Sequence, residues 1–250
     1  MVVPLYDDNP FTQPVKPVVT WCLIVANLGV YFYETGASQV GLDRMIDTFG
    51  LRPAAFAGDP GLGGWIAAFG TLISYQFFHA DIGHLLGNMI FLWVFGDDIE
   101  RALGRFFYLA FYLLCGAAGG LVFVAYDVRS DTELIGASGA IAGIVIAYVM
   151  LRPCAKVTVL IGIIPLRISA YWVIGLFVVT QLWNLGAASK SEVAYWCHFG
   201  GMLAGAMLFP LMKPPQVKLF ECMRPIPDTV VRIVSAACGG PIETQTISLA

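Results

Sequence analysis

Apolar residues are concentrated in six long stretches of the chain, and shorter polar segments separate them. A helix that crosses the hydrocarbon core of a membrane needs about 20 mostly apolar residues. By this measure the sequence predicts six membrane-spanning helices. They cover residues 18–33, 78–95, 106–126, 138–151, 168–185 and 195–212.

Two of the connecting segments are also apolar. Residues 34–76 are glycine-rich and carry Trp65, Ile66 and Phe69. We expect this first loop to lie partly in the membrane interface and to contain short helices. Residues 157–166 are too few to cross a membrane, and Lys156 and Arg167 flank them. A hairpin at the membrane surface is the expected structure there.

The predicted fold is therefore an all-α membrane protein, a six-helix bundle with a long, partly embedded first loop. Residues 1–17 form an N-terminal segment, residues 18–212 the membrane domain, and residues 213–250 a polar tail that follows a helix-ending pair of prolines. Lys and Arg are more numerous in the loops that share a side with both termini. This bias predicts that both termini face the cytoplasm.

Composition supports the membrane assignment and narrows the partners. Hydrophobic residues make up 58% of the chain and charged residues 12%, against about 25% charged residues in soluble domains. The net charge is −3 with no basic or acidic block, so we expect a lipid bilayer as partner and no nucleic acid. The six cysteines show no metal-site spacing and predict neither a zinc site nor a disulfide framework.

Several polar residues lie inside or beside the predicted spans, where they are costly and need a reason. His79 and His84 open the second span, and Asn88 follows His84 by one helical turn. Ser138 begins the fourth span, and His198 lies near the start of the sixth. Because these three spans begin on the same side of the membrane, their polar residues should form one layer.

Glycines spaced four residues apart let membrane helices approach closely. We expect the fourth and sixth helices to meet along such glycines and so to bring Ser138 within hydrogen-bond reach of His198. The spaced pairs are Gly83 and Gly87, Gly139 and Gly143, and Gly201 and Gly205.

The polar layer contains the groups needed for acyl transfer. A serine is a weak nucleophile unless a base takes its proton, and His198 can do so and then protonate the leaving amine. The Ser138 N–H, the His84 ring and the Asn88 amide are candidate donors to the oxyanion. No aspartate within a span is placed to orient His198, so the pattern predicts a dyad.

In these motifs the chain resembles the rhomboid family of intramembrane serine proteases, of prokaryotic type, over roughly residues 15–212. The resemblance implies a Ser138–His198 dyad and an oxyanion hole that includes His84 and Asn88. It also implies cleavage of transmembrane protein substrates near the outer face of the cell membrane, without cofactor or metal. The motifs are His79-x4-His84-x3-Asn88, Gly96-x3-Glu100-x3-Gly104, Gly136-Ala137-Ser138-Gly139 and His198-x-Gly200-Gly201-x3-Gly205.

Three positions depart from the family pattern. Many relatives carry an aromatic residue four positions after the serine, where this chain has Ala142. Some have a Trp-Arg pair in the first loop, but here Ile66 follows Trp65. The residue before the catalytic histidine is commonly alanine and is Cys197 here. What supports the His198 ring and what anchors the first loop are therefore open questions.

Other interpretations stand beside the protease. Ser138 could be a helix cap or packing residue, His198 could be a structural histidine, and Asn88 could form an interhelical hydrogen bond. We expect a structural role for His79, and we expect Glu100 with Arg101 to cap the second helix.

At the level of the whole protein, a non-catalytic relative that binds client helices is the main alternative. A transporter or channel would need inverted repeats, and the sequence shows none. The histidine spacing does not match a zinc protease, and the oligomeric state is open.

Overall fold

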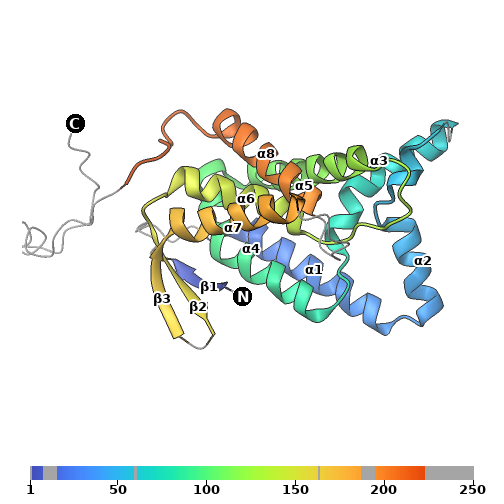
Figure 1. Ribbon diagram of the computed structural model, residues 1–250, viewed down its shortest axis with the longest axis horizontal. Helices are drawn as coiled ribbons and strands as arrows, with labels where there is room; N and C mark the ends of the chain where they lie inside the picture. The colour runs from blue at the N-terminus through green and yellow to red at the C-terminus, as the bar shows by residue number, and fades with distance from the viewer. Residues whose placement is uncertain (1, 8–15, 59–60, 163, 187–194, 223–250) are drawn as a thin grey trace, which may run out of the picture.

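The computed structural model describes residues 2–7, 16–58, 61–162, 164–186 and 195–222. Most of these residues are helical, and Figure 1 shows the arrangement of the elements. The α-helices are α1 (Val18–Gly36), α2 (Gln39–Phe49), α3 (Gly61–Ser74), α4 (Ile82–Leu103), α5 (Arg105–Tyr126), α6 (Ser138–Leu151), α7 (Ala170–Gly186) and α8 (Tyr195–Met212). The strands are β1 (Val2–Asp7), β2 (Lys156–Ile161) and β3 (Ile164–Ser169), and two 3-10 helices are η1 (Pro53–Phe56) and η2 (Tyr75–Phe77).

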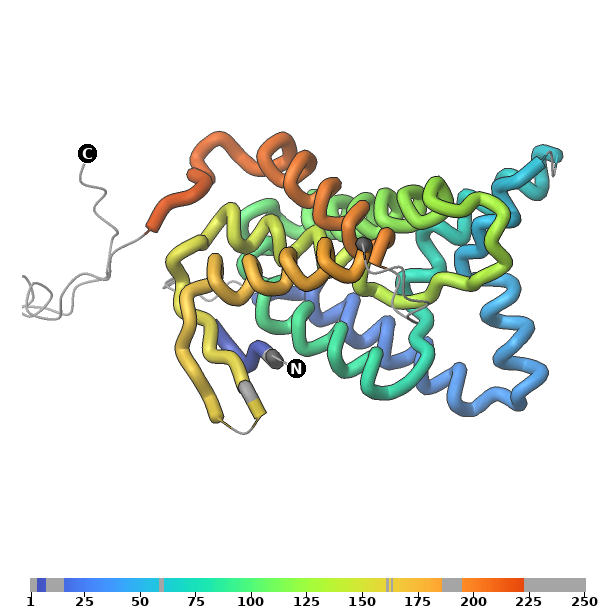
Figure 2. Tube along the Cα trace, viewed as in Figure 1, coloured from blue at the N-terminus to red at the C-terminus, as the bar shows by residue number. Residues whose placement is uncertain are grey.

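Helix α6 lies at the centre of the bundle and contacts α4, α5, α7 and α8 (Figure 2). Its sequence, from Ser138 to Leu151, is apolar on every face, and most of its residues are buried. A helix that is apolar all round is expected to be surrounded by protein or lipid. The central position of α6 therefore follows from its composition.

The predicted apolar segments all fold as helices, although their lengths differ. Within the described residues, Val18–Gly36 and Arg105–Tyr126 are long and apolar enough to cross a membrane, and the bent pair Gly61–Phe77 with Ile82–Leu103 provides a further candidate. The apolar helices Ser138–Leu151 and Ala170–Leu185 are shorter. Helix α4 continues beyond its predicted end at residue 95, because the charged residues of its last turns are paired.

A three-stranded antiparallel sheet in the order β1-β2-β3 adjoins one end of the bundle. The antiparallel pairing of β2 with β3 confirms that residues 157–166 form a hairpin. Strand β1 corrects the all-α expectation, since the N-terminal segment pairs with β2 from Val2↔Ile161 to Asp7↔Val157. The pairing shifts between Pro4 and Tyr6, as expected because proline is confined to edge strands and bulges.

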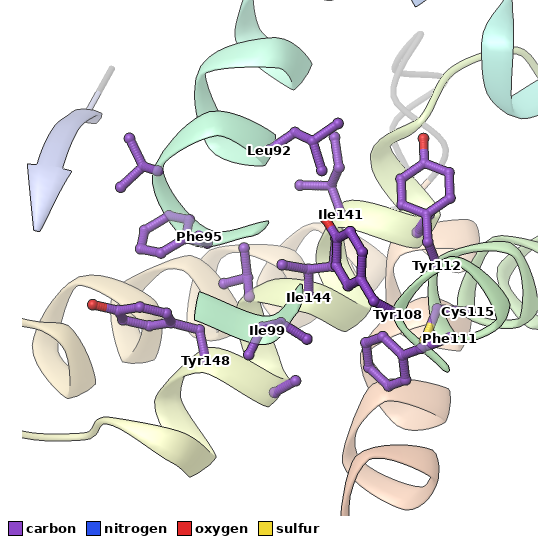
Figure 3. Close-up of a cluster of buried hydrophobic side chains, with 14 of the residues drawn as sticks. Leu92, Phe95, Ile99, Tyr108, Phe111, Tyr112, Cys115, Ile141, Ile144 and Tyr148 are labelled. Carbon is purple, nitrogen blue, oxygen red and sulfur yellow. The ribbon is translucent and has the colours of Figure 1, made fainter. Parts of the chain in front are cut away.

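Large side chains from α4, α5 and α6 form the main core (Figure 3). The rings of Phe95 and Tyr148 meet edge to face, with their centroids 4.8 Å apart. In a bilayer such packing stabilises through van der Waals contact, because lipid tails are as apolar as leucine. The labelled core residues are Leu92, Phe95, Ile99, Tyr108, Phe111, Tyr112, Cys115, Ile141, Ile144 and Tyr148.

The first loop contains the short helices that were expected, α2, η1 and α3, and contacts on the loop before α6 anchor it. Leu51 and Leu134 exchange two backbone hydrogen bonds, of 3.0 and 2.8 Å. Arg52 pairs with both Asp47 and Glu133, and its guanidinium holds the pKa of the Asp47 carboxyl below its ordinary value. This pairing supplies an anchor in a chain that lacks the Trp-Arg pair.

The charged residues at the end of α4 have a different role from the one expected. Glu100 does not cap its own helix. It accepts hydrogen bonds from the backbone N–H groups of Val19 and Thr20, at 2.9 and 2.8 Å, and so satisfies the free donors at the start of α1. Arg101 pairs with Asp97 at 2.8 Å. The carboxylate therefore joins α4 to α1, which the sequence motif alone could not indicate.

A disulfide joins Cys154, in the turn after α6, to Cys222, in the segment after α8. No disulfide framework was expected from the sequence, because the six cysteines show no paired spacing. The two bonded residues are 68 positions apart. Only the fold brings the two segments together. Among the described residues, Cys22, Cys115 and Cys197 are free thiols, and Cys238 lies outside the described part of the chain, as does most of the tail.

Candidate active site

Ser138 is the first residue of α6, and Gly136 shapes the turn that leads into the helix. Gly136 has a φ of +126°, a conformation that favours glycine. Its N–H donates to the Tyr75 carbonyl at 3.0 Å. A Cβ on Gly136 would lie 2.7 Å from Cε1 of His84. The backbone therefore passes directly against the His84 ring as it turns into α6.

His198 lies on the first turn of α8, opposite Ser138. Its Nε2 atom is 2.7 Å from the Ser138 Oγ, a normal length for such a hydrogen bond. The His198 side chain is buried, whereas Ser138 is partly exposed. The histidine is thus within reach of the serine proton, and the serine is open to a reacting group.

The contact between α6 and α8 confirms the predicted meeting of their glycines. A Cβ on Gly201 would lie 1.9 Å from the carbonyl oxygen of Gly139, and one on Gly205 would lie 2.5 Å from that of Gly143. Real side chains do not tolerate such distances, so only glycine permits this approach. We call these four residues the glycine seam.

The same expectation was wrong for α4. A Cβ on Gly87 would meet nothing within 4 Å, and one on Gly83 would meet only Asp81, at the start of the same helix. Near the site, α4 instead contributes large buried side chains, Leu85 and Met89, to the core. Glycine spacing therefore identified a tight contact on two helices and not on the third.

The structure brings His84 and Asn88 against the turn that leads into Ser138. The ideal Cβ position of Gly136 is 2.8 Å from His84 Nε2 and 3.9 Å from Asn88 Nδ2. Asn88 is 7% exposed, and its Nδ2 has no hydrogen-bond acceptor among the described residues. A buried amide donor without an acceptor is costly. The Asn88 Nδ2 is therefore a buried donor whose acceptor the described residues do not provide.

The capped first turn of α4 positions the His84 ring and the Asn88 amide. Asp81 caps the helix, and its carboxylate accepts from the His84 N–H at 2.9 Å. His79 is also buried, and its ring centroid lies 5.1 Å from that of His84. Neither of its ring nitrogens has a hydrogen-bond partner among the described residues. The His79 ring packs against His84.

Gln181 on α7 is a site residue that the sequence analysis missed. Its Oε1 lies 2.8 Å from Nδ1 of His198, and its side chain is buried. The ring of Tyr195 meets the His198 ring edge to face, with the two ring centroids 6.2 Å apart. These contacts support the imidazole where Ala142 provides no ring. A signal was present, since a glutamine lies in a mostly apolar helix, but its partner could not be read from the sequence.

Cys197 fills the space beside the glycine seam. Its sulfur lies 3.3 Å from the Tyr75 hydroxyl, and a Cβ on Gly139 would lie 2.6 Å from it. Tyr75 in turn donates to the Gly116 carbonyl at 2.8 Å. The thiol therefore packs between the first loop and α6, a position in which a small apolar residue is typical.

In the described part of the chain, no group of three or more His, Cys, Asp or Glu side chains is placed to hold a metal ion. A serine paired with a histidine in a bundle of apolar helices defines a class, the helical membrane proteins with a serine–histidine site. The Rhomboid domain profile matches residues 67–214. The chain therefore belongs to the rhomboid family and is an integral membrane protein.

Individual relatives agree with this assignment. Rhomboid protease AarA of Providencia stuartii is 29% identical over 80% of this chain and 77% of its own length. The mitochondrial RHOMBOID-like protein 12 of Arabidopsis thaliana is 32% identical, and the mitochondrial Rhomboid protein 1 of Saccharomyces cerevisiae is 29% identical, each over 55% of this chain. The chain spans only 44% and 40% of the length of these two mitochondrial relatives.

Proposed function

We propose that this protein is an intramembrane serine endopeptidase. The observation that carries the proposal is the 2.7 Å contact between Ser138 Oγ and His198 Nε2 inside an apolar helical bundle. Buried polar pairs are expensive in such a setting and are usually functional. The name of the Providencia stuartii relative, a rhomboid protease, supports the same reaction.

In the proposed reaction, the Ser138 oxygen attacks the carbonyl carbon of a peptide bond while His198 takes the hydroxyl proton. The negative oxygen of the tetrahedral intermediate would accept hydrogen bonds from the Ser138 N–H, the His84 ring and the Asn88 amide. His198 then gives its proton to the leaving amine. A water molecule, deprotonated by the same histidine, hydrolyses the acyl-enzyme and restores the serine.

The substrates we propose are transmembrane proteins, and the membrane domain is residues 18–212. We propose that α1, α4, α5, α6, α7 and α8 each cross the bilayer, because each coincides with an apolar stretch of the sequence. With both termini in the cytoplasm, Ser138 would lie toward the outer face of the cell membrane. Part of the first loop would then lie within the membrane interface.

The disulfide provides a test of this orientation. Cys154 and Cys222 would face the cytoplasm, where disulfides are rare. Thiol labelling of intact cells, with and without a permeant reductant, measures the accessibility of both cysteines. Labelling of Cys154 or Cys222 by an impermeant reagent added outside the cells would contradict the proposed orientation.

The activity is tested with purified protein in detergent and a model single-span substrate. Wild type should cleave and should react with a serine-directed fluorophosphonate. Both signals should be lost in Ser138→Ala and His198→Ala. Ser169→Ala is a matched control, because Ser169 lies on β3 and its hydroxyl accepts from Lys156. Equal cleavage by Ser138→Ala and wild type would exclude the mechanism and favour a non-catalytic protein that binds client helices.

A further inference from the structure

We infer that Gln181 is a positioning residue that selects the reactive form of His198, an inference that rests on the proposed function. Ser138 and His198 come from α6 and α8, whereas Gln181 comes from α7. The amide oxygen of Gln181 is 2.8 Å from Nδ1, and the serine oxygen is 2.7 Å from Nε2. The two ring nitrogens are therefore engaged from opposite sides.

The partner at Nδ1 decides which nitrogen is free to act as a base. A neutral imidazole carries its proton on one ring nitrogen and a lone pair on the other. An amide oxygen can only accept, so Gln181 Oε1 favours the tautomer with the proton on Nδ1. The lone pair then lies on Nε2, facing the hydroxyl of Ser138. Without this acceptor both tautomers are available, and one of them cannot take the serine proton.

The same contact also acts after the proton has moved. When His198 carries two protons, its Nδ1–H still donates to the Gln181 oxygen, so the ring keeps its direction while it returns a proton to the leaving amine. A carboxylate in this position would attract the charged imidazole, whereas the Gln181 amide carries no charge. Gln181 therefore orients the ring without bringing a charge into the bilayer, where an ionised group would be costly.

The burial of Gln181 argues that its role is specific. Its neighbours on α7 are mostly apolar, and its side chain is 9% exposed. A polar side chain in such a helix needs a partner to offset the cost of burial, and His198 is that partner.

The contact between Gln181 and His198 requires α7 to lie beside α8. A Cβ on Gly175 of this helix would meet nothing within 4 Å, so Gly175 makes no close contact of the kind seen in the glycine seam. The alignment of the imidazole therefore depends, through one side chain, on α7 remaining beside α8.

The variants Gln181→Leu and Gln181→Glu separate positioning from a purely structural hydrogen bond. In Gln181→Leu, kcat should fall about tenfold or more, as expected for a lost hydrogen bond, with KM little changed. In Gln181→Glu the acceptor remains and a negative charge favours the charged ring. The acid limb of its kcat/KM profile should therefore move to higher pH, and kcat should exceed that of Gln181→Leu.

The matched control is Asn184→Leu, which removes an amide from the same helix. Among the described residues, the Asn184 side chain donates to the Thr180 carbonyl of its own helix at 2.7 Å, so the kcat and pH profile of this variant should equal those of wild type. Rates are divided by the fraction of protein that reacts with the fluorophosphonate, which removes effects of misfolding.

The outcomes are distinguishable. A wild type that neither cleaves nor labels refutes the proposed function itself. A wild type that cleaves, with Gln181→Leu at the same kcat per labelled serine and Gln181→Glu at an unchanged pH profile, refutes the positioning role and leaves a structural hydrogen bond. If Gln181→Leu does not fold, the pH profile of the near-isosteric Gln181→Glu decides.

Discussion

The two sides of His198 are built differently. On the α6 side, the glycine seam presses two helix backbones together, with the Gly201 Cβ position 1.9 Å from the Gly139 carbonyl oxygen. On the α7 side, a single amide reaches the ring. Backbone contacts set the separation of the serine and the histidine, and a side chain sets the direction of the ring. Distance is thus controlled by rigid parts of the fold and orientation by a replaceable group.

This difference predicts two kinds of variant. Changes to backbone contacts should reduce both stability and activity, because the helices must move apart. Changes to side-chain contacts should reduce the chemical rate and leave the bundle intact. Comparing unfolding temperature with kcat for each variant separates the two.

The largest effect is expected for Gly201→Ala. The added methyl group would overlap the Gly139 carbonyl, so α6 and α8 must separate and the dyad must lengthen. We expect the free energy of unfolding to fall by at least the ~1–3 kcal/mol typical of overpacked cores. Fluorophosphonate labelling should be lost as well. Gly175→Ala is the control, since its methyl group would meet open space. Unchanged unfolding and labelling in Gly201→Ala would mean that the helices are not in close contact.

A large but purely kinetic effect is expected for Asn88→Ala. Removing one oxyanion donor typically costs about 3 kcal/mol in the transition state, or roughly a hundredfold in kcat. Because Asn88 Nδ2 has no acceptor among the described residues, the unfolding temperature should not fall. Single-turnover cleavage and thermal unfolding in detergent measure the two quantities. A lowered unfolding temperature with normal kcat would instead indicate an interhelical hydrogen bond.

Gly136→Ala should have an intermediate effect on both quantities. A residue with a side chain at φ +126° is strained by about 1–3 kcal/mol, and its Cβ would displace the His84 ring. Gly58→Ala separates these causes, because Gly58 also has a positive φ of 83° but its Cβ would meet nothing within 4 Å. Both variants should lose stability, and only Gly136→Ala should also lose kcat. Equal kcat in the two would show that His84 takes no part.

The smallest effect is expected for Arg52→Gln, which weakens the anchor of the first loop. Ion pairs that are exposed or only partly buried contribute little, so we expect the unfolding temperature to fall by less than about 4 °C, with kcat unchanged. Arg52 holds the pKa of the Asp47 carboxyl below its ordinary value. The stabilisation from this ion pair is therefore fully present at pH values above the ordinary pKa of an aspartate. The contribution disappears as the pH falls through the lowered pKa, so wild type and variant should unfold alike in acid.

The parts of the molecule that could be predicted from the sequence depend on local patterns. Apolar runs located the helices, and the spacing of Gly139, Gly143, Gly201 and Gly205 predicted which two would meet. That contact brought Ser138 to His198 as expected. These inferences succeeded because a helix repeats regularly and because small residues have a direct steric meaning.

The features that were missed depend on which elements are neighbours. Gln181 gains its role only when α7 lies beside α8, and Glu100 only when the start of α1 meets the end of α4. Strand β1 requires the β2–β3 hairpin as its template, and Cys154 requires the segment after α8. Each involves partners distant in the chain, and one sequence does not identify such partners.

The disulfide has a consequence for how the chain is connected. Because Cys154 and Cys222 are bonded, the intervening chain is a closed covalent ring that contains both α7 and α8. A single cut in the backbone of this ring would leave the molecule in one piece, because the disulfide would still join the two fragments. A nicked protein should therefore migrate as one species on a denaturing gel and separate into two only after reduction. The ring carries both Gln181 and His198, so a cut between them need not release either from the other.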